Sequence, residues 1–252
     1  MAKQASMPSR CVSREDIKVF TKALVKEHID AMGWTKPEQA ILNLREIYET
    51  VLYPKYEYDL ITDMDLGFVD NVKVLGKVIM EDKVVLVDRS IAPPNRHPQF
   101  IFTMGHEFGH SVLHPGERET FRCTQPMIMQ GQNNFLEFQA NAFSENLLMP
   151  DYLVQYRFLY CYRPTRPFVY IGSRDYWFEA EGVSRRYSIT SYTDFCTRLG
   201  SALCKYFCNT SKTSMGLKMH RLGLVKNRTA EEWGQQGMRF GNVMSKAFAG
   251  VR

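Results

Sequence analysis

Two histidines and a glutamate lie close together in a strongly apolar segment of the chain. His106, Glu107 and His110 form the pattern His-Glu-x-x-His. If this segment is a helix, its two histidines lie on one face, about 6 Å apart along the axis. Two imidazole nitrogens at that spacing can bind one tetrahedral zinc ion, at about 2.0–2.1 Å each. Glu107 can then take a proton from a water molecule at the open position without binding the metal itself.

The alternative is a polar helix face that carries two unrelated histidines. The flanking residues argue against it, because this is an unusually apolar helix, with Phe100, Ile101, Phe102, Met104, Phe108, Val112 and Leu113. Polar side chains placed in such a core need partners, and a metal ion supplies them. The sequence therefore predicts a metal site.

A catalytic zinc site normally has three protein ligands. His114 follows His110 by four residues, but it lies about 12 Å of helix rise beyond His106. A straight helix cannot bring all three histidines onto one ion, so we expect His114 to cap the helix end or to pack near the site.

Glu137 is the better candidate for the third ligand. It lies in a segment, residues 135–143, that reads as a second helix with Glu137 and Asn141 on one face. Asn141 could accept a hydrogen bond from the outer ring nitrogen of a metal-binding histidine. The competing carboxylates are Glu117, Glu119 and Glu145.

Three short motifs resemble the ImmA/IrrE family of zinc metallopeptidases. They are G-H-E-F-G-H-S-V-L-H at 105–114, E-F-Q-A-N-A-F at 137–143 and L-L-M-P at 147–150. The resemblance covers roughly residues 13–150 and 193–225. Ser144 stands where the family motif usually has alanine.

This resemblance implies a zincin-like fold with one zinc ion per chain. It places His106, His110 and Glu137 at the metal-ligand positions and Glu107 at the position of the catalytic base. Family members are typically cytoplasmic and are often carried on mobile elements or in stress-response loci. They regulate transcription by cleaving a DNA-binding repressor that has a helix-turn-helix domain, which would here be a separate protein.

The patterns predict an α+β fold: N-terminal helices, a small antiparallel sheet, the helix pair of the metal site and a C-terminal helical hairpin. The expected organisation is a loose leader (1–12), a zincin-like core (13–150), an aromatic and arginine-rich insertion (151–192) and a C-terminal helical region (193–252). Apolar periodicity and start signals predict helices after Ser13 and after Thr35, at roughly 96–113 and 133–148, near 193–207 and at 211–222.

A β-rich stretch, residues 72–87, predicts a hairpin that turns at Glu81-Asp82-Lys83. A free edge of this hairpin could hold an extended substrate by main-chain pairing. The hairpin could equally be ordinary sheet core.

Charge is spread unevenly along the 252 residues. Residues 1–150 hold 16 Lys and Arg against 20 Asp and Glu, whereas residues 151–252 hold 16 against 7. A basic second half is consistent with an acidic partner or nucleic acid, or with a solvated face. Direct nucleic-acid binding is not what we expect, and the sequence leaves the oligomeric state open.

The stretch from Tyr152 to Phe195 contains 13 aromatic residues in 44. It could form a cover over the metal site or a layer packed on the core. The six cysteines show no C-x-x-C pair, which predicts reduced, packed thiols. No apolar run is long enough to cross a membrane, so we expect a cytoplasmic protein without membrane contact.

The favoured function is a zinc-dependent endopeptidase that cleaves a protein partner. The alternative is a catalytically silent zinc domain that binds protein or DNA. In a helix-turn-helix version of that alternative, the residues meeting phosphates would be Lys205, Lys212, Lys218 and Arg221.

Overall fold

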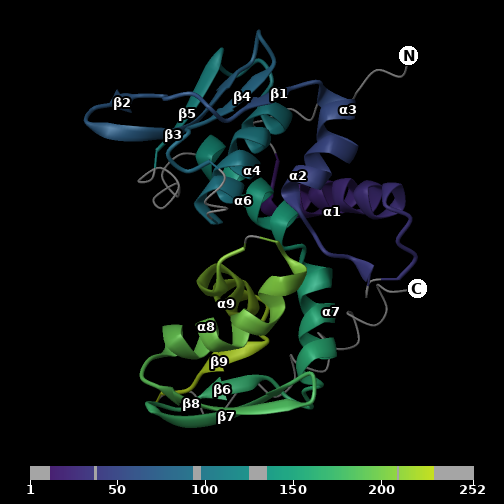
Figure 1. Cartoon of the computed structure of the whole chain (residues 1–252), viewed down its shortest axis with the longest axis vertical. Coiled ribbons are helices and arrows are strands. Elements are labelled where there is room, and N and C mark those ends of the chain that lie inside the picture. Colours follow the sequence, from purple (N-terminus) through teal and green to yellow (C-terminus); the bar gives the residue numbers. More distant parts are fainter. Residues whose placement is uncertain (1–11, 37–38, 93–97, 125–134, 209, 230–252) are drawn as a thin grey trace. The chain divides into compact units, whose positions relative to one another are not determined.

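The chain forms two compact units, each with its own helices and strands, so the fold is α+β. The first unit contains Met1–Gly33 and Leu42–Pro150, and the second contains Trp34–Ile41 and Asp151–Arg252. The computed structural model, shown in Figure 1, describes residues 12–36, 39–92, 98–124, 135–208 and 210–229.

Helix α1 (Arg14–Ala31) opens the first unit. The Ser13 hydroxyl accepts a hydrogen bond from the Asp16 amide at 3.2 Å, and the Asp16 carboxylate accepts one from the Ser13 amide at 2.9 Å. This reciprocal capping satisfies two amide groups that the first helical turn would leave without partners. The predicted start after Ser13 is confirmed.

The second helix begins later than the sequence predicts. It starts at α2 (Leu44–Ile47), passes through a π-helical turn (Tyr48–Leu52) and ends as α3 (Tyr53–Tyr56). The predicted start at Thr35 is wrong, because the Gln39 side chain accepts hydrogen bonds from the amides of Thr35 and Lys36 and holds them in a separate turn. Pro37 and Glu38, which also belonged to that start signal, lie outside the described residues.

In the described part of the first unit, five strands form one sheet: β1 (Asp59–Ile61), β2 (Phe68–Val69), β3 (Val72–Ile79), β4 (Val84–Val87) and β5 (Thr120–Thr124). Strands β3 and β4 are antiparallel, with Gly76 opposite Val87 and Ile79 opposite Val84, which confirms the predicted hairpin.

That hairpin offers no free edge near its centre. Strand β3 pairs with β4 and also with β2 and β5, while β4 pairs with β3 and with the parallel strand β1. The interpretation of the hairpin as sheet core is therefore the correct one. Among the described strands, β1, β2 and β5 each pair with one other strand only.

Helix α4 (Pro98–Leu113) packs on β3, β4 and β5, and helix α6 (Phe135–Leu148) packs on α4 (Figure 1). Both lie within the predicted helical ranges. Twelve of the 16 residues of α4 are buried, so polar groups on this helix meet protein rather than solvent.

Among the described residues, the second unit contains four helical segments and four strands. They are α7 (Asp151–Tyr162), β6 (Phe168–Tyr170), β7 (Arg174–Ala180), β8 (Val183–Ile189), α8 (Tyr192–Leu203), a 3₁₀ turn (Cys204–Tyr206), α9 (Lys212–Arg221) and β9 (Val225–Asn227). The helices predicted near 193–207 and at 211–222 are confirmed, whereas α7 and the β7–β8 hairpin were not predicted.

The aromatic stretch supplies much of the core of this unit. Phe168 packs edge-on against both Phe158 and Phe178, with ring centroids 5.8 and 5.7 Å apart. Phe158 and Phe178 are buried, while Trp177 is 67% exposed. Alternation along β7 therefore turns one face of the hairpin inward and leaves Trp177 in solvent.

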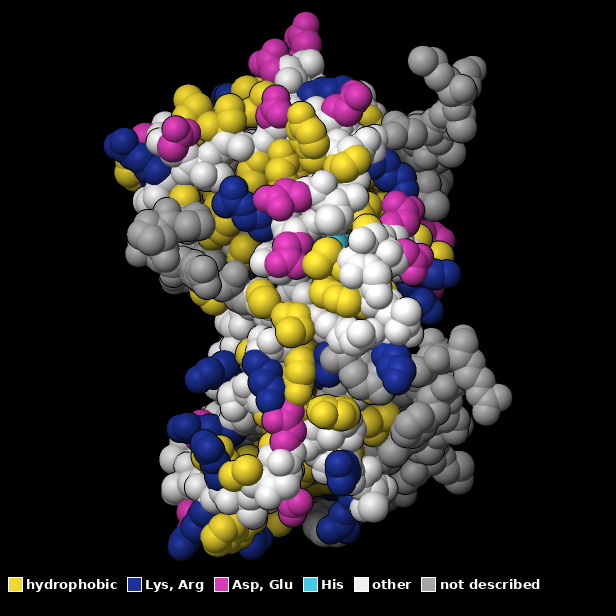
Figure 2. Space-filling view, turned by 45° about the vertical axis from the view of Figure 1, so that its right-hand side comes forward, with side chains coloured by type: hydrophobic (Ala, Val, Ile, Leu, Met, Phe, Trp, Pro, Cys, Tyr) yellow, Lys and Arg dark blue, Asp and Glu magenta, His cyan; other side chains and the backbone are white. Residues whose placement is uncertain are grey.

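The positive charge of the second unit is largely on its surface. Figure 2 shows many Lys and Arg side chains and few acidic ones over this unit, whereas both signs are mixed over the first. Lys218 is an exception, since it is buried and pairs with Asp151 at 2.5 Å. In the described part of the chain, no helix is both long enough and apolar enough to cross a membrane.

Candidate metal centre

Helices α4 and α6 approach each other unusually closely, at two glycines of α4. A Cβ atom on Gly105 would lie 2.6 Å from the Ser144 hydroxyl, and one on Gly109 would lie 2.9 Å from the Cα of Ala140. Each glycine immediately precedes a histidine of the motif. The missing side chains let the two backbones approach, and this approach brings Glu137 of α6 to the histidines of α4.

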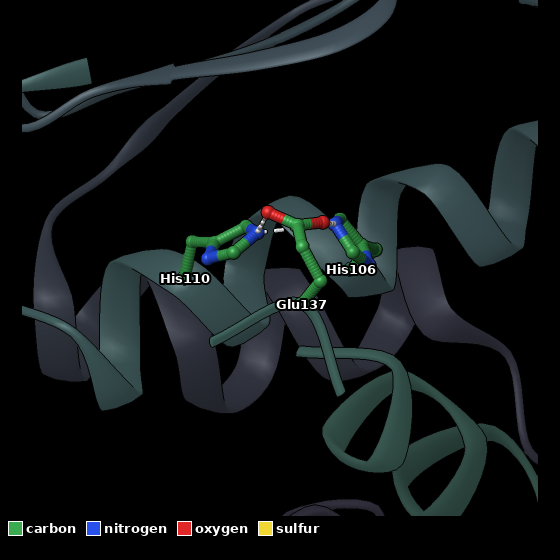
Figure 3. Close-up of side chains that lie close together, drawn as sticks. All are labelled: His106, His110 and Glu137. Carbon is green, nitrogen blue, oxygen red and sulfur yellow. Dashed lines mark hydrogen bonds and ion pairs between the residues drawn. The ribbon is translucent and has the colours of Figure 1, made fainter. Parts of the chain in front are cut away.

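His106, His110 and Glu137 converge on one point (Figure 3). His106 Nε2 lies 3.1 Å from Glu137 Oε2, and His110 Nε2 lies 3.3 Å from Glu137 Oε1. The two Nε2 atoms are 3.1 Å apart. Both histidines are fully buried and Glu137 is 3% exposed, so the point at which they meet is inside the protein.

The other ring nitrogen of His106 has a partner on α6. His106 Nδ1 lies 3.0 Å from Asn141 Oδ1, one helical turn beyond Glu137. An amide oxygen can only accept, so His106 donates its proton from Nδ1. Its Nε2 then carries a lone pair that points toward Glu137.

A longer chain of hydrogen bonds fixes the proton of His110. The Gln139 amide nitrogen donates to the Val12 carbonyl at 2.8 Å, so its oxygen must accept from His114 Nε2, also at 2.8 Å. His114 Nδ1 is then an acceptor, and it takes the proton of His110 Nδ1 at 2.9 Å. This leaves a lone pair on His110 Nε2 as well.

The result is a cluster of electron-pair donors with no proton between them. Two imidazole lone pairs and a carboxylate face one another at hydrogen-bond distance, and Glu137 Oε2 has no hydrogen-bond partner. Burial lowers the pKa of His110 to about 3, so its ring is neutral. A cation bound between these atoms would satisfy all of them, and two histidines with one carboxylate are the ligand set of a catalytic zinc site. The residues therefore fit the metal.

The charge of Glu137 is favoured within this cluster. Burial by itself would raise the pKa of its carboxyl group, but the adjacent imidazole rings of His106 and His110 outweigh burial and lower it. An ionised carboxylate is the form that binds a divalent cation.

Glu107 lies beside the cluster in a fully buried position. Neither carboxylate oxygen has a hydrogen-bond partner. A Cβ atom on Gly76 of β3 would lie 2.5 Å from Glu107 Oε1, so the glycine makes room for this side chain. Burial, followed by the negative charge of Glu137, raises the pKa of Glu107 well above its usual range. Such a group is poised to hold a proton near neutral pH.

Strand β5 contributes two side chains beneath α4. The Phe121 ring stacks on the His110 ring, with centroids 4.1 Å apart and planes 17° apart. Two residues further along, Cys123 forms a second candidate metal-binding group with His106 and Glu107, in which the donor atoms lie within 4.8 Å of one another.

The structure places the remaining sequence candidates outside the ligand cluster. His114 lies behind His110 rather than beside the metal position, and Glu145 pairs with Arg14 at 3.2 Å. Neither Glu117 nor Glu119 belongs to a metal-binding group among the described residues.

Sequence reasoning did not single out three residues that shape the site: Gly76, Cys123 and Gln139. Gly76 and Cys123 lie opposite each other on neighbouring strands, which no local spacing reveals. Gln139 lies between Glu137 and Asn141, and only the structure shows that it is buried.

Comparison with known protein families agrees with this geometry. Residues 84–174 match the model of the IrrE N-terminal-like domain, a peptidase family. The search of curated proteins finds no match. The matched segment contains α4 and α6 with all three residues of the cluster, as well as Glu107 and Cys123. This match covers somewhat more than a third of the chain and supports its resemblance to the ImmA/IrrE peptidase family.

Proposed function

We propose that this protein is a zinc-dependent endopeptidase. The observation that carries the proposal is the buried meeting of two imidazole lone pairs and one carboxylate, with the proton of each histidine committed to a partner on the far side of its ring. His106, His110 and Glu137 would hold one zinc ion per chain. A bound zinc supplies Lewis-acid chemistry, since it polarises a peptide carbonyl and lowers the pKa of water to about 7.

Glu107 is the group that would move protons. Its carboxylate takes a proton from the attacking water and holds it at one of the oxygens that have no other partner. It then passes this proton to the nitrogen of the leaving amine.

The substrate would be held as an extended segment along β5. This strand packs on α4 and, among the described strands, pairs only with β3. Main-chain pairing to its other edge would accept many sequences, which suits an enzyme that recognises its partner mainly through other contacts.

We further propose that the partner is a DNA-binding repressor with a helix-turn-helix domain, cleaved in the cytoplasm. Support for the partner is the resemblance to the ImmA/IrrE family. Support for the compartment is that Cys123, Cys161, Cys196 and Cys204 are free thiols, as is usual in a reducing environment.

A catalytically silent zinc domain is the second candidate, and the basic surface of the second unit favours it (Figure 2). Direct phosphate binding through the residues named from sequence is weakened by two contacts. Lys218 is buried against Asp151, and Lys205 pairs with Glu181. This candidate would bind its partner without cleaving it.

The first prediction separates the two candidates with the variant Glu107→Gln. Glutamine keeps the size of the side chain but cannot accept the proton, so we expect zinc to remain at one ion per chain while cleavage is lost. Metal analysis measures the zinc, and electrophoresis after incubation with a candidate helix-turn-helix repressor measures cleavage.

His110→Ala is the matched control and should lose the zinc itself. Cleavage by the Glu107→Gln protein within a few-fold of wild type would show that Glu107 is not the base. Repressor that binds intact to the zinc-loaded wild type would favour the silent domain.

A further inference from the structure

The second unit contains a pocket that shares no residue with the metal centre. Its volume is about 330 Å³, near the lower end of the range for protein pockets that bind small molecules. Its walls come from the β7–β8 hairpin and from α8, and Tyr162 of α7 also lines it. All of the lining residues belong to this one unit. The pocket is therefore separate from the proposed peptidase chemistry.

Strand alternation decides which arginine of β8 reaches the pocket. Arg185 pairs with Phe178 across the hairpin, and both residues line the pocket. The adjacent pair, Arg186 and Trp177, projects from the opposite face and does not line it. Arg185 and Arg186 are thus neighbours in sequence with different surroundings, so one can serve as a control for the other.

Three aromatic residues give the pocket an apolar wall. They are Tyr162, Phe178 and Tyr187. Phe178 and Tyr162 are buried, and the ring centroids of Phe178 and Tyr187 lie 5.6 Å apart. The Tyr162 hydroxyl donates to the Leu199 carbonyl at 2.5 Å, so its proton is already used. A ligand that fills the pocket would therefore place a flat apolar part against these rings.

Glu181 brings a negative charge to the pocket, and that charge is already balanced within the protein. Its Oε2 atom pairs with Lys205, which also lines the pocket. Its Oε1 atom accepts a hydrogen bond from the Tyr206 hydroxyl at 2.5 Å. Glu181 and Lys205 together therefore contribute no net charge toward a ligand.

Two further arginines in the lining, Arg185 and Arg198, leave the pocket with positive charge. Arg185 is exposed and makes no ion pair or hydrogen bond through its side chain in the described part of the chain. Arg198 donates from Nε to Asp194 at 3.1 Å, and its guanidinium carbon lies 5.7 Å from the centre of the Tyr187 ring. The Arg198 side chain is 50% exposed, and an ion pair at such a surface is weak. Both guanidinium groups are thus available to an anion.

We propose that this pocket binds a small organic anion, which places a carboxylate or phosphate group on Arg185 and Arg198 and a flat apolar body against the aromatic wall. Guanidinium groups bind both kinds of head group through paired hydrogen bonds. The volume of the pocket suits one small molecule rather than a peptide or nucleic-acid chain. This binding site does not rest on the proposed peptidase function.

Fluorescence titration with 8-anilinonaphthalene-1-sulfonate tests the proposal. This probe is an aromatic anion whose fluorescence rises when it leaves water, and its sulfonate is a weak ligand of zinc. The full chain is titrated as wild type, Arg185→Gln, Arg198→Gln and Arg186→Gln. Arg186→Gln is the matched control, since it removes the same charge from the opposite face of the hairpin. N-phenyl-1-naphthylamine, which has the same rings without the sulfonate, is the neutral probe.

We expect wild type and Arg186→Gln to bind one molecule of the anionic probe per chain with equal affinity. Arg185→Gln and Arg198→Gln should each bind it about 10- to 100-fold more weakly, as expected for the loss of a hydrogen bond to a charged group. Wild type that shows no saturable binding overturns the proposal. Affinities that are equal in Arg185→Gln and Arg186→Gln, or equal for the anionic and neutral probes, also overturn it.

Competition with the bound probe then identifies the head group. Phenyl phosphate and benzoate carry the same ring on a phosphate and on a carboxylate, and the one that displaces the probe at the lower concentration has the preferred group. If neither displaces it, the proposal is overturned.

Discussion

The protons on His106 and His110 are placed by residues that do not touch the metal position. Asn141 sets the first, and the series His114, Gln139 and the Val12 carbonyl sets the second. Partners of this kind orient the ring and raise its basicity as a ligand. Asn141, which the sequence places one turn after Glu137, therefore has a role that can be measured apart from catalysis.

The second prediction is that Asn141→Leu lowers zinc affinity by about 10- to 100-fold, because His106 loses the acceptor that holds its proton on the outer nitrogen. Chelator competition measures the affinity. Asn141→Asp keeps an acceptor at the same place and should restore most of the binding.

Asn146→Leu is the matched control for this experiment. Asn146 is buried on the same helix, and its side chain bonds the Ala142 carbonyl rather than a histidine. Equal losses of affinity at positions 141 and 146 would mean that Asn141 acts only through the stability of α6.

At the scale of elements, the spacing between α4 and α6 decides whether Glu137 reaches the histidines. Alanine at Gly109 would press against backbone atoms of Ala140, which cannot rotate away as the end of a long side chain could. The third prediction is that Gly109→Ala lowers the free energy of unfolding by about 1–3 kcal/mol and weakens zinc binding as well. Denaturant unfolding and chelator competition measure the two effects.

Ser111→Ala is the control for Gly109→Ala, because it changes α4 without changing its approach to α6. The Ser111 hydroxyl bonds the Phe108 carbonyl within the same helix. If Gly109→Ala binds zinc as tightly as Ser111→Ala does, close helix approach is not what positions Glu137.

Site residues on helices could be predicted from the sequence more readily than site residues on strands. His106, His110, Glu137 and Asn141 lie on helices, where a spacing of four residues fixes a shared face, so their convergence could be anticipated. The role of Gly76 cannot be anticipated in the same way. It depends on the pairing of β3 with β5, whose residues lie far away in the sequence.

The predicted start of the second helix was wrong because a side chain took the hydrogen bonds of backbone amides at that start. Gln39 satisfies two amides that the predicted helix would have used, and Asn43 provides the actual start by accepting from the Arg45 amide at 3.1 Å. The β7–β8 hairpin was not predicted, because its segment was interpreted from composition alone, as an aromatic and arginine-rich insertion.

At the scale of the whole molecule, the metal site lies entirely within the first unit, since α4, α6, β3 and β5 all belong to it. The fourth prediction is that free zinc at 100 times its dissociation constant stabilises this unit by about 2.7 kcal/mol. Amides of α4 and α6 that exchange only when the unit unfolds should then exchange about 100-fold more slowly, while those of α8 and α9 should change little. Hydrogen exchange followed by mass spectrometry measures this.

The control for hydrogen exchange is His110→Ala, in which zinc should protect neither unit. Equal protection of α8 and α9 in the wild type would show that the two units unfold together rather than separately.

The chain passes between the two units after Gly33, after Ile41 and after Pro150, so the second unit is assembled from two stretches of sequence. Arg157 joins these stretches: its buried guanidinium donates to the Ala40 carbonyl at 2.8 Å and lies 3.7 Å from the centre of the Tyr206 ring. A fragment that begins at Asp151 would lose this hydrogen bond, at a cost of about 1.5–3 kcal/mol. We therefore expect a chain cut after Pro150 to stay together as a complex of two fragments. The fragment that ends at Pro150 still carries Trp34–Ile41, which completes the fold of the other.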